Sequence, residues 1–429
     1  MTTPHPHRAG AAAIVRALRD AGHVAYFAGG CVRDELLGRV PSDYDVATEA
    51  TPDRIAKMFP RSSHVGAAFG VMLVHPPGGV SKDVIEVATF RTDASYTDKR
   101  RPDSVTFSTP EADAQRRDFT VNALFLDPFD QPRPGDGPLP GRWQGGRVID
   151  FVGGLADLAR RTLRAVGDPN QRLAEDHLRA LRAVRLAAKL EFAIDTATAE
   201  AIRAHAAELT GVSRERIGDE LRMMFGHPSR ARAAAALHGL GLCGPVLGTG
   251  RWSGSGTTTL SGLADPVSFG VAIAAWGLDL GVDYKQHSIR SEFVDVARRG
   301  LCLSNEERAE VAHALEGLAV MQAVDGWRSW PVAKQKRFAA SEACCAGMPL
   351  LSVVDAPCAA SVAARIAELA ATEGGIAPPP LLTGDHLVSL GLRPGPRFKR
   401  VLDAVYDAQL EGRVRNLEQA RELVAKMDV

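Results

Sequence analysis

The sequence has few cysteines, and none of them stands at a metal-binding spacing. Its six cysteines show no C-x-x-C pair and no companion histidine, so neither a zinc site nor a disulfide framework is expected. No apolar run approaches a membrane span, and the opening MTTPHPHRAG lacks a basic segment followed by a long apolar one, which argues against an anchor and a signal peptide. We therefore expect a protein of the reducing cytoplasm with no membrane partner.

The formal net charge of the chain is zero. The 51 basic and 51 acidic residues cancel, which disfavours a broad polyanion binder and leaves open a specific nucleic acid held by local basic patches. No internal repeat occurs, and no His-Asp dipeptide points to an appended metal-dependent phosphohydrolase domain. At 429 residues the chain exceeds one ordinary core, so two to four domains are expected.

Helix and strand signals alternate in the first 150 residues, whereas helix signals dominate from Leu155 onward. Residues 9–21 have a helical pattern, and His23–Ala28 is expected to form a strand. Further strands are expected at residues 69–75, 83–90 and 121–126, and one long amphipathic helix at 173–190. This order predicts a small α+β domain followed by all-α domains.

Two aspartates one residue apart, Asp43 and Asp45, are the most informative feature of the chain. If Tyr44 lies on a strand, both carboxylates occupy one face of it and the tyrosine occupies the other. Paired oxygen ligands can hold Mg²⁺ together with substrate phosphates. Gly29 and Gly30, which open onto an expected helix, offer backbone N–H groups to a triphosphate. Together these residues indicate metal-dependent nucleotidyl transfer.

A third acid, Glu86, stands in the middle of the apolar segment 83–90. It either completes the carboxylate cluster or activates a hydroxyl group, or it faces solvent on the polar side of the strand. The residues themselves favour neither interpretation.

A second group comprises Arg116, Arg117 and Asp118, just ahead of the apolar segment 121–126. The two guanidinium groups could contact phosphate, and the carboxylate could accept a ribose hydroxyl. Taken alone, the segment is more typical of a solvated strand flank.

A third group is the pair Asp176 and Arg179, i and i+3 on the expected helix 173–190. They would project from one face, and an intrahelical ion pair is the simpler interpretation. If the pair instead recognises a base, the carboxylate would accept a hydrogen bond from an exocyclic amino group, and the guanidinium would donate one to an acceptor atom of the ring. Cytosine and adenine present that edge, whereas guanine and uracil present mismatched groups.

These motifs resemble those of the class II tRNA nucleotidyltransferases and bacterial poly(A) polymerases, members of the polymerase-β-like superfamily. They occur in the family's order across about residues 20–225. The matching segments are Gly29–Asp34 with Asp43 and Asp45, Arg116–Ala123, Ile149–Pro169, Glu175–Arg182 and Ser213–Leu221. Residues 381–409 are similar, less distinctively, to C-terminal segments of the family.

The resemblance implies that Asp43 and Asp45 bind two Mg²⁺ ions, and we place Glu86 beside them as a catalytic candidate. It also implies that the glycines and Arg33 hold the triphosphate, that Asp118 with Arg116 or Arg117 reaches the ribose, and that Asp176 and Arg179 read the base. The expected nucleotide-binding set is Gly29, Gly30, Arg33, Asp34, Arg116, Arg117, Asp118, Asn122, Asp176, Arg179, Arg182 and Arg185.

The expected RNA contacts lie far from these motifs. A basic cluster, Arg393, Arg397, Lys399 and Arg400, follows a rigid Pro-Gly-Pro turn and is our candidate for gripping RNA. Residues 91–105 are a full-length candidate for the family's flexible loop. By the resemblance, an enzyme that adds only the two C residues would be expected to have a shortened loop. The full-length segment therefore disfavours that function.

We therefore expect a template-independent tRNA nucleotidyltransferase that builds or repairs the 3′-terminal CCA from CTP and ATP. The expected fold is an α+β nucleotidyltransferase head with a small mixed or antiparallel sheet at 1–152, a helical neck at 153–226, and a helical body and tail at 227–429. The expected partners are tRNA and nucleoside triphosphates, not DNA. The alternatives are a poly(A) polymerase, an A-adding-only enzyme, a small-molecule nucleotidyltransferase and a non-catalytic RNA-binding protein.

Overall fold

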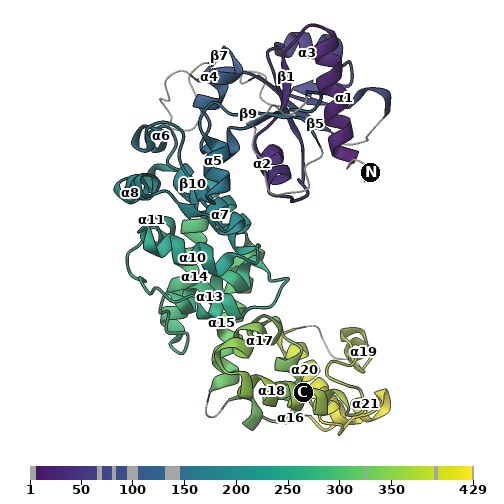
Figure 1. The fold of residues 1–429 in the computed structure, drawn as a ribbon. Helices are drawn as coiled ribbons and strands as arrows, with labels where there is room; N and C mark the ends of the chain where they lie inside the picture. The colour runs from purple at the N-terminus through teal and green to yellow at the C-terminus, as the bar shows by residue number, and fades with distance from the viewer. Residues whose placement is uncertain are drawn as a thin grey trace. The chain divides into compact units, whose positions relative to one another are not determined.

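The computed structural model forms two compact units (Figure 1). One comprises residues 1–212 with 240–242, and the other comprises 213–239 with 243–429. The structure describes residues 6–64, 70–79, 84–93, 105–130, 145–323, 326–390 and 395–427. Among these residues, no helix has both the length and the apolar character needed to cross a membrane.

A seven-stranded mixed sheet forms the centre of the first unit, in the order β3-β4-β5-β2-β1-β8-β9. Only the β2–β5 pair is parallel, and the other neighbours are antiparallel. The strands are β1 Ala25–Ala28, β2 Asp45–Thr48, β3 Ser62–His64, β4 Val71–Val74, β5 Ile85–Thr89, β8 Phe125–Asp127 and β9 Arg147–Ile149. A separate antiparallel pair joins β6 Arg91–Asp93 and β7 Val105–Phe107. The predicted mixed sheet is confirmed.

Short helices surround this sheet. They are α1 Pro6–Asp20, α2 Gly30–Leu36, η2 Pro77–Gly79, α3 Pro52–Met58, α4 Pro110–Gln115 and η3 Thr120–Asn122. α1 packs on β1, β2 and β5, and buried side chains such as Phe90 and Phe125 fill a core with edge-on rings 5.7 Å apart. The expected strand at 121–126 is displaced, since a 3₁₀ turn occupies Thr120–Asn122 before β8 begins.

Helices dominate the remainder of the first unit. They are α5 Gly154–Ala159, α6 Pro169–Glu175, α7 Arg179–Leu190, α8 Thr196–Ala204 and η4 Ala206–Gly211, with a two-stranded parallel pair of β10 Thr162–Leu163 and β11 Ala193–Ile194. The prediction of one helix over 173–190 is wrong. Asp176 adopts an extended conformation (φ −153°, ψ 104°), and its side chain accepts from the Leu178 N–H, so α6 ends and α7 begins anew.

The second unit is helical throughout its described residues. Its elements are α9 Arg214–Phe225, α10 Arg230–Gly239, α11 Cys243–Leu247, α12 Thr258–Gly262, α13 Phe269–Asp279, α14 His287–Leu301, α15 Asn305–Gln322, η5 Trp327–Ser329, α16 Val332–Ala339, α17 Glu342–Val354, α18 Ala356–Ala370, α19 Gly384–Ser389, α20 Pro396–Leu410 and α21 Leu417–Ala425. A Cβ on Gly317 of α15 would lie 1.8 Å from the Ala343 carbonyl oxygen of α17. Glycine therefore allows these two helices to pack closely.

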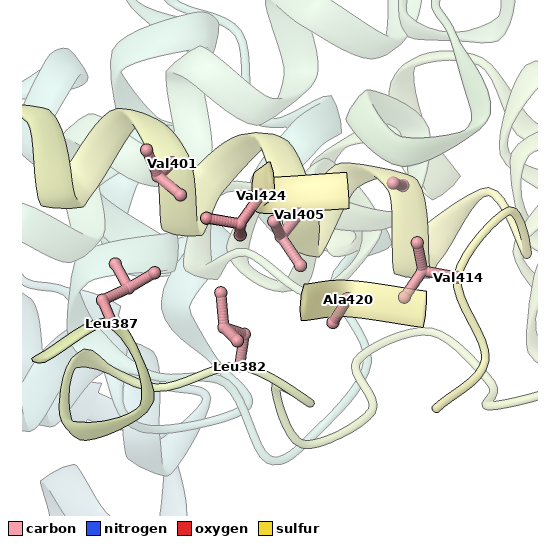
Figure 2. Close-up of a cluster of buried hydrophobic side chains, with 8 residues drawn as sticks. Leu382, Leu387, Val401, Val405, Val414, Ala420 and Val424 are labelled. Atoms are coloured by element: carbon pink, nitrogen blue, oxygen red, sulfur yellow. The ribbon is translucent and has the colours of Figure 1, made fainter. Parts of the chain in front are cut away.

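The C-terminal helices have a hydrophobic core of their own. Figure 2 shows side chains of α19, α20 and α21 meeting around Leu382, Val405 and Val424. Arg337 of α16 contacts the outer side of α20, with its Nε donating to Asp407 at 2.6 Å. The expected all-α tail is confirmed.

Candidate active site

Asp45 is the first residue of β2, whereas Asp43 and Tyr44 precede that strand, yet the three side chains still alternate in exposure. Asp43 is exposed and Asp45 half-buried, whereas Tyr44 between them is 2% exposed. The tyrosine hydroxyl donates to Glu35 at 2.6 Å, and Arg8 of α1 donates to the same carboxylate oxygen at 2.7 Å. This Arg8–Glu35–Tyr44 network was not predicted from the sequence. It fixes the side chain of Tyr44, which lies between the two aspartates.

Glu86 lies beside the aspartates because β5 runs parallel to β2. Val46 pairs with Val87, so Asp45 and Glu86 occupy matching positions one residue earlier on neighbouring strands. Burial together with the charges of Glu86 and Asp43 raises the pKa of Asp45 to about 7, although Arg117 opposes the shift. Glu86 is exposed on β5, yet partial loss of hydration and the Asp43 charge raise the pKa of its carboxyl group as well. Crowded carboxylates of this kind are the environment that a divalent cation stabilises.

Gly29 and Arg117 connect the glycine turn to this acidic group. Gly29 has φ 76°, and a Cβ there would lie 3.0 Å from Nη1 of Arg117. Arg117 also donates to the Asn122 carbonyl at 3.0 Å, and its guanidinium lies 5.0 Å from the centre of the Phe125 ring. Glycine is required at this turn both by its backbone conformation and by the guanidinium beside it.

Arg33 belongs to the same group of side chains. It is 6% exposed, and its guanidinium donates to Asn122 at 2.5 Å and to Asp34 at 2.8 Å. The Gly30 turn lies against it, since a Cβ on Gly30 would be 3.6 Å from Arg33 Nη2. Gly29, Gly30, Arg33, Asp34, Arg117 and Asn122 are thereby gathered at one place in the fold.

Asp113 positions both arginines of the second motif, and sequence reasoning missed it. It is 2% exposed, and it accepts from Arg116 at 2.9 and 2.6 Å and from Arg117 at 3.2 and 3.0 Å. Burial raises the pKa of Asp113, but the two guanidinium charges outweigh that effect and leave it lowered. The only signal in the sequence is the i+3 and i+4 spacing to the two arginines.

Replacing Asp113 with Asn is expected to destabilise the protein by about 3 kcal/mol at pH 7, because it breaks a buried, doubly paired carboxylate. The folded pKa is lowered, so this stabilisation is present above about pH 4 and is lost as pH falls through the folded value. Urea denaturation at pH 7 and at pH 3 measures both effects. The exposed Glu111→Gln in the same helix is the control, and equal stabilities for wild type and Asp113→Asn would contradict this role.

Asp118 connects the head to α7. Its Oδ2 accepts from Arg182 Nε at 2.9 Å and Nη2 at 2.6 Å, and its Oδ1 accepts from the Phe119 N–H and the Asn122 amide. Burial opposes ionisation, yet the Arg182 charge leaves the pKa of Asp118 lowered. Four donors occupy the four acceptor positions of the carboxylate. A ribose hydroxyl would therefore have to replace one of them.

Arg179 lies close to Asp176 in the chain but forms its ion pair with another residue. Its Nη1 contacts Glu175 and donates to the Arg172 carbonyl at 2.5 Å. Arg172, missed by sequence reasoning, pairs with Glu175 at 2.9 Å and donates to the Gln115 carbonyl at 2.7 Å. Asp176 lies outside both helices, so the expected i, i+3 helical pair is wrong. The break leaves Asp176 in the turn that precedes α7.

The remaining predicted site residues lie on α7 and in the C-terminal tail. Arg182 and Arg185 are half-buried residues of α7. In the tail, Arg397, Lys399 and Arg400 are exposed at the start of α20. Arg393, and residues 94–104 of the expected loop, lie outside the described residues.

Comparison with known proteins identifies the family to which the chain belongs. A family model described as "Poly A polymerase head domain" matches residues 25–164, and one described as "Probable RNA and SrmB- binding site of polymerase A" matches 191–247. The CCA-adding enzyme of Limosilactobacillus fermentum is 33% identical over 411 residues, which cover 94% of this chain and 92% of the relative. The chain belongs to the family of CCA-adding enzymes.

Other CCA-adding enzymes align over shorter stretches. The enzyme of Geobacillus stearothermophilus is 40% identical over 230 residues, 53% of this chain and 52% of the relative, so the match spans about half of its length. The crystal structure of the Bacillus stearothermophilus CCA-adding enzyme in complex with CTP has a TM-score of 0.76 at 28% identity. It covers 99% of this chain and 98% of that chain. The head followed by helical regions is thus the fold of this family.

Proposed function

We propose that the chain is a tRNA nucleotidyltransferase that adds or repairs the 3′-terminal CCA from CTP and ATP without a nucleic-acid template. The observation that carries the proposal is the group of Asp43, Asp45 and Glu86 beside the Gly29 turn, in a chain of the CCA-adding enzyme family. Its expected setting is the cytoplasm. Its expected divisions remain a head at 1–152, a neck at 153–226, and a body and tail at 227–429.

Two Mg²⁺ ions suit the acidic group, with Asp43 and Asp45 as their ligands. The hard carboxylate oxygens match the ion, and the raised pKa of Asp45 reflects negative charge that a cation would offset. In the part of the chain that the structure describes, the ligand atoms of these three acids do not all lie within 4.8 Å of one another. Mg²⁺ is usually held by one or two carboxylates together with substrate phosphates, which would complete its coordination here. When bound, Mg²⁺ would supply Lewis-acid stabilisation of the phosphate charge.

The proposed reaction needs no covalent enzyme intermediate. The RNA 3′-hydroxyl attacks the α-phosphorus, a new P–O bond forms, and the bond to pyrophosphate breaks. Glu86 is the candidate acceptor of the hydroxyl proton. Gly29, Gly30 and Arg33 hold the triphosphate, and Arg117 lies close enough to the same turn to share in this role.

We assign recognition of the base to Asp176 and Arg179. Contact with the ribose is assigned to Asp118 together with Arg116 or Arg117. The Asp118–Arg182 pair fixes α7 against the motif that precedes η3. This contact supports a positioning role for Asp118, since it connects the expected ribose motif to the helix that carries Arg179.

Substrate specificity separates this proposal from a poly(A) polymerase and from a non-catalytic RNA-binding protein. A tRNA ending in CC and an unstructured oligoadenylate are each incubated with Mg²⁺ and every nucleotide singly, and the products are sized at single-nucleotide resolution. We expect one A on the tRNA and little on the oligoadenylate. A long A ladder on the oligoadenylate would indicate a poly(A) polymerase, and no addition to either RNA would indicate a non-catalytic RNA-binding protein.

The exposed cluster of Arg397, Lys399 and Arg400 in the second unit is proposed to contact tRNA. Changing all three to Glu should weaken tRNA binding and lower the salt dependence of log K by roughly one unit per lost phosphate contact. Fluorescence anisotropy across a salt series measures both. Arg421→Glu on α21, also exposed, is the matched control, and an unchanged salt slope in the triple variant would rule this contact out.

A further inference from the structure

Two histidines and a glutamate from separate elements of the first unit meet in the fold. His177 lies in the turn between α6 and α7, His205 caps the end of α8, and Glu208 lies in η4. One ligand atom from each lies within 4.8 Å of the other two. Among the residues that the structure describes, this is the one group of three such side chains that meets that spacing.

The distances within this group match those of a metal site. Oε2 of Glu208 lies 3.3 Å from Nε2 of His177 and 3.0 Å from Nδ1 of His205. Donor atoms bound to a tetrahedral zinc ion are separated by about 3.4 Å, given metal–ligand distances near 2.1 Å. Glu208 thus lies at this spacing from both imidazole nitrogens, which lie within 4.8 Å of each other.

One residue of the group is buried, and the other two are accessible to solvent. The His177 side chain is 3% exposed, while those of His205 and Glu208 are 21% and 47% exposed. The Glu208 N–H donates to the His205 carbonyl at 3.1 Å, which fixes these two residues on one turn. An ion could enter from solvent, and a water molecule could take a fourth position.

We propose that His177, His205 and Glu208 form a binding site for a divalent transition-metal ion, with zinc as the best match. Imidazole nitrogen is a common zinc ligand, and two histidines with one carboxylate make a known zinc donor set. Mg²⁺ prefers oxygen ligands, so this site differs in chemistry from the Asp43 and Asp45 site.

An ion bound here would hold the turn that carries the base-reading residues. His177 stands between Asp176 and Arg179, and its carbonyl accepts from the Ala180 N–H at 3.1 Å at the start of α7. Fixing the ring to η4 would restrict the orientation of that turn. This consequence rests on the proposed function, whereas the binding of the ion does not.

Zinc binding to the full chain tests the site directly. Equilibrium dialysis with zinc compares wild type, His205→Ala and Glu208→Gln, where the glutamine keeps its hydrogen-bonding capacity but loses the charge. Since losing a group that merely supports a ligand weakens binding 10- to 100-fold, removing a ligand should weaken it by about 100-fold or more. His313→Ala is the control, because that ring lies 3.0 Å from the Glu342 carboxylate but belongs to no such group of three among the described residues.

Cobalt substitution gives a second readout that does not depend on activity. Cobalt bound to the wild type should show the strong visible absorption of a tetrahedral site, and His205→Ala should lack it. Equal zinc affinity in wild type, His205→Ala and Glu208→Gln, or a weak octahedral cobalt spectrum in wild type, would overturn the proposal. Zinc binding without nucleotide addition would uphold this site and refute the proposed function, and the reverse result would do the opposite.

Discussion

Replacing Asp45 with Asn is expected to lower the rate of nucleotide addition by on the order of 10³-fold or more, because the variant would lose one of the two carboxylates proposed to bind Mg²⁺. The change keeps the size of the side chain, so the fold should be retained. Single-turnover addition to tRNA, measured with saturating Mg²⁺ and CTP, tests this result. Asp53→Asn, an exposed carboxylate of α3, should leave the rate unchanged.

The same variant should be more stable than the wild type at pH 8 when divalent cations are removed. Burial with the charges of Glu86 and Asp43 raises the pKa of Asp45 to about 7, so the folded state binds a proton more readily than the unfolded state. Wild-type stability therefore falls as pH rises from about 4 to about 7. The stability advantage of Asp45→Asn should shrink as pH falls through that window. Thermal denaturation at pH 5 and pH 8 measures it, and a less stable variant at pH 8 would contradict the crowding of these carboxylates.

Replacing Arg179 with Ala is expected to relax nucleotide choice while leaving metal binding intact. One well-formed contact to a base edge discriminates by about 1–3 kcal/mol, so the preference for CTP and ATP over GTP and UTP should fall by about 10- to 100-fold. The ratio of kcat/KM values for the four nucleotides is the measurement. The change also releases Glu175, which pairs with Arg172 as well.

Two comparisons separate base reading from a structural role for Arg179. Arg203→Ala, an exposed position on α8, should leave the four ratios as they are. Glu175→Gln removes the ion pair but keeps the guanidinium, so it should change nucleotide choice less than Arg179→Ala does. Unchanged selectivity in Arg179→Ala would remove this residue from base recognition.

The parts of the site that could be predicted from sequence depend on short-range geometry. The alternation of Asp43, Tyr44 and Asp45 was predicted from the period of a strand. The structure buries the tyrosine, half-buries Asp45 and leaves Asp43 exposed, although β2 begins only at Asp45. The position of Glu86 could not be settled in this way. Its place beside Asp45 depends on the parallel pairing of β2 with β5, which links segments about forty residues apart and carries no local signal.

The residues that were missed stand in ordinary helical sequence. Glu35 matters because the fold brings Arg8 and Tyr44 to it. Asp113 pairs with Arg116 and Arg117 at helical spacing, and its importance comes from its burial, which the spacing does not reveal. The break between α6 and α7 was missed for a different reason. Apolar periodicity continues across 173–190, while one aspartate side chain that bonds to the Leu178 N–H ends the helix. The spacing of apolar residues indicates which face is buried, but it does not reveal where a side chain ends the helix.

The most direct test of the account is the length of product made from a tRNA that lacks all three terminal nucleotides. The purified chain is incubated with Mg²⁺, CTP and ATP, and products are resolved at single-nucleotide steps. We expect addition of C, C and A followed by a stop, with two additions when CTP is given alone. No addition to this tRNA, or addition of A without the two preceding C residues, would contradict it.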